Sequence, residues 1–513
     1  MAPQYRNPVL PGTHPDPSIC RVGDDYYLAC SSFEFFPGLP LFRSRDLVNW
    51  RAIGHALTRN SQLDLHGCKS SLGIFAPTLR HIGGRFYLVT TNLNKFRNFL
   101  VWADHAEGPW SEPVWLDWPG IDPSLFEDED GRVFISGNGG FLGDEPVGIY
   151  QAEIDLATGT LLSPRRLVWK GTGGKAPEGP HLYRRGGWYY LLIAEGGTEY
   201  GHMVTVARST QPAGPFEPCP HNPILSHRSL DSPIQATGHA DLVEAADGRW
   251  WAVFLGIRPA PVRFAGQHHH LGRETFLAPV TWTEDGWPRI GPVSETMDAG
   301  ALPIQPVEAP AARTEFDGTV LPPAFNHLRN PPPGSWSLQT RPGWLTLQGQ
   351  PDTLDDAAAP AFVGRRQQHF ACEVATLLDF EPAADGDEAG LTVFKSERFH
   401  YEIAIGRRAD QRVIFLRRRI GSLWKVELAQ PLPPGELLLG LRADAQHYRF
   451  FHQRPGQPEQ DFGSGECALL STETAGGFTG VYLALYATGN GRASQAPACF
   501  RWLDYRPIGP TSP

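Results

Sequence analysis

Short apolar and aromatic runs alternate with turn-forming residues along the first part of the chain. Five of these runs directly follow a turn built from Gly-Asp, Gly-Gly or Asp-Gly, over residues 23–28, 83–88, 130–135, 186–191 and 247–252. Such pairs supply the positive φ angles that a two-residue hairpin turn requires. Another short strand-like run precedes each turn, so the pattern predicts five β-hairpins.

The predicted hairpins recur roughly every 50–60 residues, with further strand-like segments between them. Four-stranded sheets repeated around an axis hide their edges in a β-propeller. A solenoid is disfavoured because the spacing is irregular and long loops intervene. The pattern therefore predicts an all-β fold that starts with a five-bladed β-propeller over residues 1–303.

Alternation of polar and apolar positions resumes after a Pro-rich stretch. Residues 304–313 are typical of a stiff linker. Residues 314–513 contain alternating segments separated by turn residues, which predicts a second, sandwich-like β-domain. We interpret Arg417-Arg418-Arg419 within it as a solvent-exposed strand face.

The repeat places chemically active side chains at equivalent positions. Three of them lie nine residues before a turn glycine: Asp122, Glu178 and His239, before Gly131, Gly187 and Gly248. Asp16 occupies nearly the same place before the first turn. The innermost strand of each blade lines the channel of a propeller, so these side chains should meet at one mouth. Turn chemistry alone explains a single Asp-Pro-Ser motif, but it does not explain acids in register in several copies.

Carboxyl groups that face each other in a channel are typical of glycoside hydrolysis. One protonates the leaving oxygen, and the other attacks the anomeric carbon or activates water. Their separation decides between inversion and retention, and the sequence does not contain that distance. The aromatic content of 11% suits sugar binding by stacking, although most rings should pack inside the blades.

Composition narrows the classes of partner. The net charge is −10 and no Lys/Arg run stands out, which disfavours nucleic-acid and anionic-membrane partners. No run of 18 apolar residues occurs, so no membrane span is expected. The N-terminus has no signal-peptide core, and the seven scattered cysteines lack metal-ligand spacing. We therefore expect reduced thiols and a cytoplasmic location; the oligomeric state is left open, with a homo-oligomer as one option.

Several motifs occur in an order that resembles glycoside hydrolase family 43. They are His14-Pro15-Asp16-Pro17-Ser18, Phe75-Ala76-Pro77, Ile121-Asp122-Pro123-Ser124-Leu125-Phe126, Glu178-Gly179-Pro180-His181, Ala194-Glu195-Gly196-Gly197-Thr198, Gly238-His239-Ala240-Asp241 and Leu271-Gly272-Arg273-Glu274-Thr275. The resemblance covers essentially the whole chain. It is strongest to the two-domain members, which are β-xylosidases and α-L-arabinofuranosidases with a concanavalin-like sandwich that caps the pocket.

The resemblance implies an inverting mechanism with three carboxyl groups. Asp16 matches the general base that activates water, and Glu178 matches the general acid. Asp122 matches the residue that orients this acid and raises its pKa. A neighbouring anion does disfavour ionisation of a carboxyl group, so this assignment agrees with elementary electrostatics.

The resemblance also implies residues that bind the substrate. Arg273 matches an arginine that grips sugar hydroxyls, and Phe33, Phe75 and Phe141 match aromatic pocket walls. Phe478 matches a sandwich residue that reaches over the pocket.

Metal binding is open at one position and disfavoured at another. The chemistry requires no cofactor. His239 matches a histidine that is either hydrogen-bonded or next to a structural Ca²⁺ ion in the channel, and in two-domain members the first interpretation is favoured. We interpret His268-His269-His270 as a loop, because consecutive residues do not easily converge on one metal ion.

Together these observations predict an exo-acting glycosidase that removes terminal xylose or arabinofuranose from xylan-derived oligosaccharides. Two alternatives stay open: an endo-arabinanase of the same fold, and a propeller lectin that binds sugar without cleaving it. A retaining fructan hydrolase is disfavoured because its Asn-Asp-Pro motif is absent.

Overall fold

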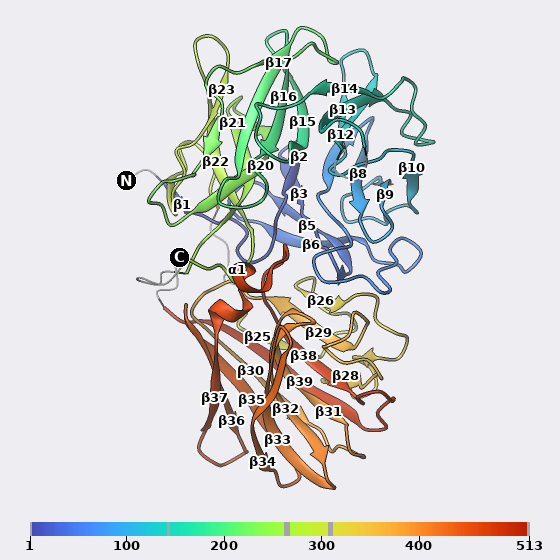
Figure 1. Cartoon of the computed structure of the whole chain (residues 1–513), viewed down its shortest axis with the longest axis vertical. Coiled ribbons are helices and arrows are strands. Elements are labelled where there is room, and N and C mark those ends of the chain that lie inside the picture. The colour runs from blue at the N-terminus through green and yellow to red at the C-terminus, as the bar shows by residue number, and fades with distance from the viewer. Residues whose placement is uncertain (1–2, 141–143, 261–266, 306–310, 510–513) are drawn as a thin grey trace.

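The computed structural model describes residues 3–140, 144–260, 267–305 and 311–509. Within them an N-terminal propeller stacks end to end on a C-terminal β-sandwich (Figure 1). The described residues include only two short helices, η1 (Cys467–Leu470) and α1 (Thr472–Ala475). No helix in this part of the chain is long and apolar enough to cross a membrane.

The described propeller strands form five antiparallel blades, each ordered as in the chain. Blade 1 consists of β2 (Ser18–Val22), β3 (Asp25–Ala29), β5 (Gly38–Ser44) and β6 (Arg51–Leu57). Blade 2 consists of β7 (Thr78–Ile82), β8 (Arg85–Asn92), β9 (Arg97–Ala103) and β10 (Val114–Leu116). Blade 3 consists of β11 (Ser124–Glu127), β12 (Val133–Gly139), β13 (Gly148–Glu153) and β14 (Arg166–Trp169).

Blade 4 consists of β15 (Glu178–Arg185), β16 (Trp188–Glu195), β17 (Met203–Ser209) and β18 (Glu217–Pro218), with β19 (Leu225–Ser226) also on β17. Blade 5 consists of β20 (Gln235–Glu244), β21 (Trp250–Ile257), β22 (Glu274–Trp282) and β23 (Pro288–Ile290). Each predicted turn joins the first two strands of a blade, and its glycines have positive φ, for example 82° at Gly131 and 79° at Gly248. The predicted five-bladed propeller is confirmed.

The N-terminal segment closes the propeller ring. Strand β1 (Gln4–Arg6) pairs with β24 (Thr296–Asp298), which follows blade 5. The Asn7 side chain both donates to and accepts from the Leu277 backbone at 2.9 Å. Further along, the His14 amide donates to the Arg273 carbonyl at 3.0 Å. This closure brings the first and last strands of the propeller domain together, and it places Asp16 next to Arg273.

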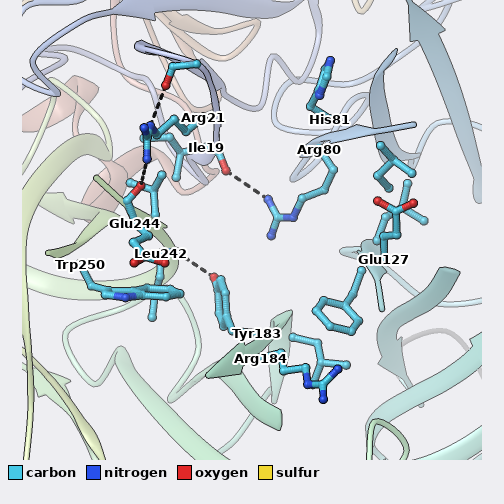
Figure 2. A pocket seen from close by; sticks show the side chains of 16 residues that line it. Ile19, Arg21, Arg80, His81, Glu127, Tyr183, Arg184, Leu242, Glu244 and Trp250 are labelled. Atoms are coloured by element: carbon cyan, nitrogen blue, oxygen red, sulfur yellow. Dashed lines mark hydrogen bonds between the residues drawn. The ribbon is translucent and has the colours of Figure 1, made fainter. Parts of the chain in front are cut away.

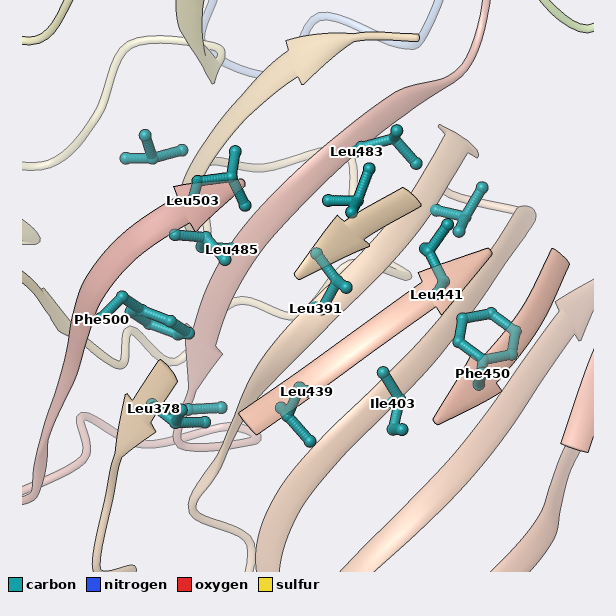
Figure 3. Packing of buried hydrophobic residues seen from close by; sticks show 14 of the residues in the cluster. Leu378, Leu391, Ile403, Leu439, Leu441, Phe450, Leu483, Leu485, Phe500 and Leu503 are labelled. Carbon is teal, nitrogen blue, oxygen red and sulfur yellow. The ribbon is translucent and has the colours of Figure 1, made fainter. Parts of the chain in front are cut away.

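The C-terminal domain is a sandwich of two antiparallel sheets. The first has the order β27 (Trp336–Ser337), β28 (Leu345–Gln348), β39 (Pro497–Pro507), β30 (Cys372–Asp379), β35 (Leu437–Ala443), β36 (His447–Gln453) and β37 (Gln460–Glu466), with β25 (Arg313–Glu315) on β39. The second has the order β34 (Leu423–Pro431), β33 (Gln411–Ile420), β32 (Phe399–Arg408), β31 (Glu388–Ser396), β38 (Tyr482–Thr488), β29 (Ala361–Arg366), β26 (Phe325–Leu328) and β4 (Phe35–Phe36). Figure 3 shows the core between them, where Leu391 and Leu485 of one sheet pack with Leu439 and Phe500 of the other.

One strand of the propeller sequence belongs to the sandwich. Strand β4 pairs with β26 at the edge of the second sheet, and the Phe35 ring stacks on Tyr482 with ring centres 3.7 Å apart. Because only Glu34 separates Phe33 from β4, one pocket wall is tied to the second domain. Half of the predicted linker, at 306–310, lies outside the described residues, and the sandwich strands begin at Arg313.

The interpretation of the arginine run as an exposed face is wrong for Arg417. This side chain is buried, and its guanidinium pairs with Glu402 at 2.5 Å and with Glu388 at 2.9 Å. Arg418 and Arg419 are partly exposed. Arg417, the first residue of the run, is buried because two hydrogen bonds to the Glu402 carboxylate satisfy its charge.

Candidate active site

The residues predicted to converge lie at the start of the innermost strands. Asp16 and Asp122 each lie two residues before β2 and β11, and His239 lies within β20. All three have a left-handed backbone, with φ of 55°, 54° and 49°. This conformation is uncommon for residues other than glycine. Its recurrence in three blades indicates that the repeat register matched equivalent positions.

The predicted side chains share one cavity of about 280 Å³. Its lining includes Asp16, Phe33, Phe75, Asp122, Glu178, His239, Arg273 and Phe478. Phe141, the remaining predicted wall residue, lies outside the described residues. Sequence reasoning had assigned no role to Lys175 and Glu199, which also line the cavity and pair with each other at 2.9 Å.

Asp16 is held as an anion at the base of the cavity. Ser31 donates to its Oδ2 at 2.5 Å, and Arg273 Nη1 donates to its Oδ1 at 2.9 Å. Burial alone would raise the pKa of Asp16. Arg273, the nearby His239 and the Ser31 hydrogen bond outweigh burial and hold this pKa below its usual value. An ionised carboxylate can accept a proton, so Asp16 is poised as a base.

Glu178 and Asp122 are shifted in the opposite direction. Burial, together with the charge of Asp16, raises the pKa of Glu178 to about 7. Burial also raises the pKa of Asp122 well above its usual value, with further contributions from Glu178 and Asp16. The Gly179 amide donates to Asp122 Oδ2 at 3.1 Å and so ties Asp122 to the peptide that follows Glu178. Asp16 is thus the anion that raises the pKa of Glu178, and Asp122 holds its own proton more tightly than expected.

Arg273 and three phenylalanine rings form a further part of the cavity wall, next to Asp16. The guanidinium carbon of Arg273 lies 5.7 Å from the ring centre of Phe33 and 5.5 Å from that of Phe478. These two rings stack at 6.2 Å, and Phe75 meets them edge-on at 5.6 and 6.0 Å. Arg273 also donates to Thr198 Oγ1 at 3.0 Å. The wall presents apolar ring surface and one fixed cation to the cavity.

A segment of the sandwich, residues 472–481, completes this wall and is here named the cap segment. Its first and last amides, those of Thr472 and Val481, donate to the carbonyls of His269 and His270 at 3.2 and 2.9 Å. Gly480 approaches the propeller so closely that a Cβ there would lie 2.2 Å from a propeller carbonyl oxygen. The His268-His269-His270 run is a loop, as interpreted. Its backbone and the His269 side chain form hydrogen bonds with the cap segment.

Glu195 organises the loop that leads to Glu178, although sequence reasoning had given it no role. Its fully buried carboxylate accepts from the amides of Thr172 and Gly174 at 3.0 Å and from Thr205 Oγ1 at 2.6 Å. Buried charges are retained where they are fully hydrogen-bonded. The Ala194-Glu195-Gly196-Gly197-Thr198 motif was the available signal.

A buried ion pair lies further along the innermost strands than the site. Two residues beyond His239, Asp241 accepts two hydrogen bonds from Arg80, at 2.8 and 3.1 Å, and one each from Ser18 and Tyr183. Asp241 therefore joins blades 1, 2 and 4 to its own blade. Arg80 also bonds His181 Nδ1 at 2.9 Å.

The far mouth of the channel is a separate cavity of about 490 Å³. It is lined by later residues of the innermost strands, among them Arg21, Glu127 and Arg184, and Figure 2 shows Arg80 and Tyr183 beside it. The Arg80–Asp241 layer lies between the two cavities along these strands.

The surroundings of His239, where a structural Ca²⁺ ion was left open, offer few side-chain ligands among the described residues. Ca²⁺ takes six to eight oxygen ligands, whereas no group of three or more His, Cys, Asp or Glu in the described part of the chain could hold a metal ion. His239 Nδ1 lies 3.8 Å from Asp16 Oδ1, an oxygen that already accepts from Arg273. Burial lowers the pKa of His239, with Asp16 opposing this shift. We assign no step to a metal ion.

A family model described as glycosyl hydrolases family 43 matches residues 5–288. A second, described as the β-xylosidase C-terminal concanavalin A-like domain, matches residues 313–506. The chain belongs to glycosyl hydrolase family 43. It is therefore a glycosidase rather than a propeller lectin, and its second domain has the concanavalin-like sandwich expected for the two-domain members of family 43.

Members of family 43 resemble the chain over nearly its full length. A non-reducing-end α-L-arabinofuranosidase of Bacteroides ovatus is 43% identical over 98% of this chain and 94% of its own length. A xylosidase/arabinosidase of Butyrivibrio fibrisolvens is 39% identical over 95% of this chain and 96% of its own. The solved structure described as Bacteroides ovatus xyloglucan PUL GH43B has a TM-score of 0.94 at 42% identity, and covers 99% of this chain and 100% of that one.

Proposed function

We propose that this family 43 enzyme removes a terminal L-arabinofuranose or D-xylose from short xylan-derived oligosaccharides, with inversion at the anomeric carbon. The observation that carries the proposal is that the pKa values of two carboxyl groups in one cavity are shifted in opposite directions. The pKa of Asp16 is lowered, and the pKa of Glu178 is raised to about 7. An inverting glycosidase needs a base and an acid in these states at the same pH.

The proposed reaction is a single displacement. Water attacks the anomeric carbon while Asp16 accepts one of its protons. Glu178 donates its proton to the glycosidic oxygen as the carbon–oxygen bond breaks. The products leave Asp16 protonated and Glu178 ionised, and proton exchange with solvent restores both. Asp122 keeps the peptide after Glu178 in place through the Gly179 amide.

The shape of the cavity supports release of one terminal sugar. About 280 Å³ lies at the small end of ligand pockets, which suits a single pentose and a few water molecules. Phe33, Phe75 and Phe478 offer ring faces to the apolar face of a sugar. The cap segment covers one side of the site, which favours an exo-enzyme over an endo-arabinanase that needs an open groove.

The similarity to named relatives supports both pentoses as the sugar that is released. One relative is named a non-reducing-end α-L-arabinofuranosidase, and the other a xylosidase/arabinosidase. We propose α-L-arabinofuranosides and β-D-xylosides as alternative substrates of the same cavity. The same three residues would act on either sugar. Asp16 activates the water that attacks the anomeric carbon, Glu178 protonates the leaving oxygen, and Arg273 binds sugar hydroxyls.

The test is kinetic and stereochemical. We expect turnover of aryl α-L-arabinofuranoside and aryl β-D-xyloside, and little release from linear arabinan. Proton NMR of the first product should show β-L-arabinofuranose or α-D-xylose, the inverted anomers. First appearance of the retained anomer would overturn the roles proposed for Asp16 and Glu178.

A further inference from the structure

Two buried charged residues lie at the base of the cap segment, one from each domain. Lys395 is in strand β31 of the sandwich and is 2% exposed; Glu34 directly follows the pocket wall residue Phe33 and is 0% exposed. Neither contacts the cavity. Both connect to Phe478 through the peptide backbone of the cap segment.

Lys395 holds the carbonyl next to Phe478. Its Nζ donates to the Thr479 carbonyl oxygen and, at 3.2 Å, to Thr472 Oγ1. In the part of the chain that the structure describes, no carboxylate lies within 4.0 Å of Nζ. Burial lowers the pKa of Lys395 to about 8, with Glu34 and Glu473 opposing the shift.

A buried ammonium without a paired carboxylate is costly, and an apolar side chain would serve packing better. The hydrogen-bond donors of Lys395 are directed to the cap segment. This arrangement indicates that the lysine positions the cap segment rather than stabilising the sandwich core.

Glu34 holds the amide of Phe478 through an intermediate residue. Its Oε2 accepts from the Ser71 amide at 2.9 Å, and Ser71 Oγ accepts from the Phe478 amide at 2.8 Å. Ser71 has a left-handed backbone with φ of 65°, so its orientation depends on such support. A Cβ at Gly477 would lie 2.4 Å from Ser71 Oγ, which shows how closely the two domains approach here.

The charged neighbours of Glu34 belong to the sandwich domain. Burial raises the pKa of Glu34 to about 7, Glu397 adds to the shift, and Arg329 opposes it. Oε1 of Glu34 accepts no hydrogen bond from the described residues. The carboxylate is thus present at a cost in free energy, as Lys395 is, and among the described residues its one donor outside its own residue is the Ser71 amide.

We propose that Lys395 and Glu34 are positioning residues of the active site. They hold Phe478 in the cavity wall through two backbone groups, the amide of Phe478 and the carbonyl of the residue that follows it. Lys395 acts through the Thr479 carbonyl, and Glu34 acts through Ser71. The inference rests on the proposed function in one respect, namely that Phe478 contacts the bound sugar.

The test is a double-mutant cycle of Lys395→Met and Phe478→Ala, with kcat and KM measured on both aryl pentosides. We expect Lys395→Met to raise KM about 3- to 10-fold with a smaller change in kcat, because it weakens a binding contact. In the Phe478→Ala background the same substitution should change KM less than about 2-fold. Lys425→Met is the matched control, since Lys425 is exposed and pairs only with Glu427 on the distant strand β34.

Thermal unfolding separates positioning from stability. Lys395→Met should leave the melting temperature unchanged or raise it, because it removes a buried charge. A lower melting temperature with unchanged KM, or additive effects of Lys395→Met and Phe478→Ala, would overturn the proposal.

Glu34 offers an independent check through its own substitutions. Glu34→Gln keeps an oxygen that can accept from the Ser71 amide, so it should preserve KM, whereas Glu34→Ala should raise it. Equal KM values for these two variants would remove Glu34 from the positioning role. Failure of inversion in the product NMR would instead overturn the proposed function, and it would leave the cycle unaffected.

Discussion

Replacing Glu178 by glutamine is expected to stabilise the folded protein increasingly as the pH rises. In the unfolded chain this carboxyl group titrates near 4.5, whereas in the fold burial and Asp16 raise its pKa to about 7. Below pH 4.5 both states hold the proton, and the substitution removes no penalty. Between pH 4.5 and 7 the unfolded state ionises first, so the wild-type protein loses stability as the pH rises. Above pH 7 the full penalty is present.

The size of this effect follows from the pKa values. A rise from 4.5 to about 7 corresponds to about 3 kcal/mol at 1.36 kcal/mol per pH unit. Glu178 is partly exposed to the cavity, and water there screens the charge, so we expect about 2 kcal/mol at pH 8. Such a change should raise the melting temperature by about 2–3 °C. Removing the Glu178 charge also eases ionisation of Asp122, which acts in the same direction.

The assay is thermal unfolding of the wild-type protein and the Glu178→Gln variant from pH 4.5 to 8.5. Glu127→Gln is the matched control, because Glu127 is exposed at the other mouth of the same channel. Activity is measured in parallel. Loss of a positioned acid should reduce kcat/KM by about 10²–10⁴-fold on pentosyl oligosaccharides. The loss should be smaller on aryl glycosides, whose phenolate leaves without a proton.

Two results would refute this reasoning. A difference in melting temperature that stays constant from pH 4.5 to 8.5 would mean that the pKa of Glu178 is not raised in the fold. Equal losses of activity on aryl and oligosaccharide substrates would mean that Glu178 does not protonate the leaving oxygen.

Three further substitutions test the neighbouring groups. Asp16→Asn should lower kcat/KM by about 10²–10⁴-fold on aryl and oligosaccharide substrates alike, because every substrate needs an activated water; a loss confined to oligosaccharides would contradict the base role. Asp122→Ala should lower kcat/KM but leave the alkaline limb of the pH–kcat/KM profile in place, because Asp122 holds the peptide after Glu178 whereas Asp16 supplies the charge that raises the pKa of Glu178; a limb moved to lower pH would contradict this division of roles. Asp241→Asn should destabilise the protein by about 3–5 kcal/mol in urea unfolding, because it leaves the Arg80 charge unpaired. Adding Arg80→Met should recover part of that loss, and no recovery would contradict the pairing.

Local chemistry in the sequence was enough to predict the architecture. Gly-Gly and Asp-Gly turns form hairpins because of the φ angles they permit, and this preference does not depend on distant residues. The repeat then aligned Asp16, Asp122 and His239, whose shared left-handed backbone reflects equivalent places in three blades. The resemblance to family 43 rested on motifs of a few consecutive residues, which the sequence displays directly.

Contacts between distant residues were decided only by the tertiary structure. Ser71 and Phe478 are 407 positions apart, and neither the Lys395 contact with Thr479 nor the Arg80–Asp241 pair has a local sequence signal. Arg417 illustrates the same limit of sequence analysis. A run of arginines predicts an exposed strand face, and only the tertiary structure shows that Glu402 and Glu388 pair with Arg417.

The charge states of the catalytic carboxyl groups also required the fold. Asp16 and Glu178 are chemically similar acids; the resemblance to family 43 implied which is base and which is acid, but local sequence chemistry gives no physical reason for it. Arg273, from the last blade, lowers the pKa of Asp16, whereas burial and the resulting Asp16 anion raise that of Glu178. Electrostatic free energies depend on burial and on distances between charges, and both are set only when the propeller ring closes and the sandwich covers it.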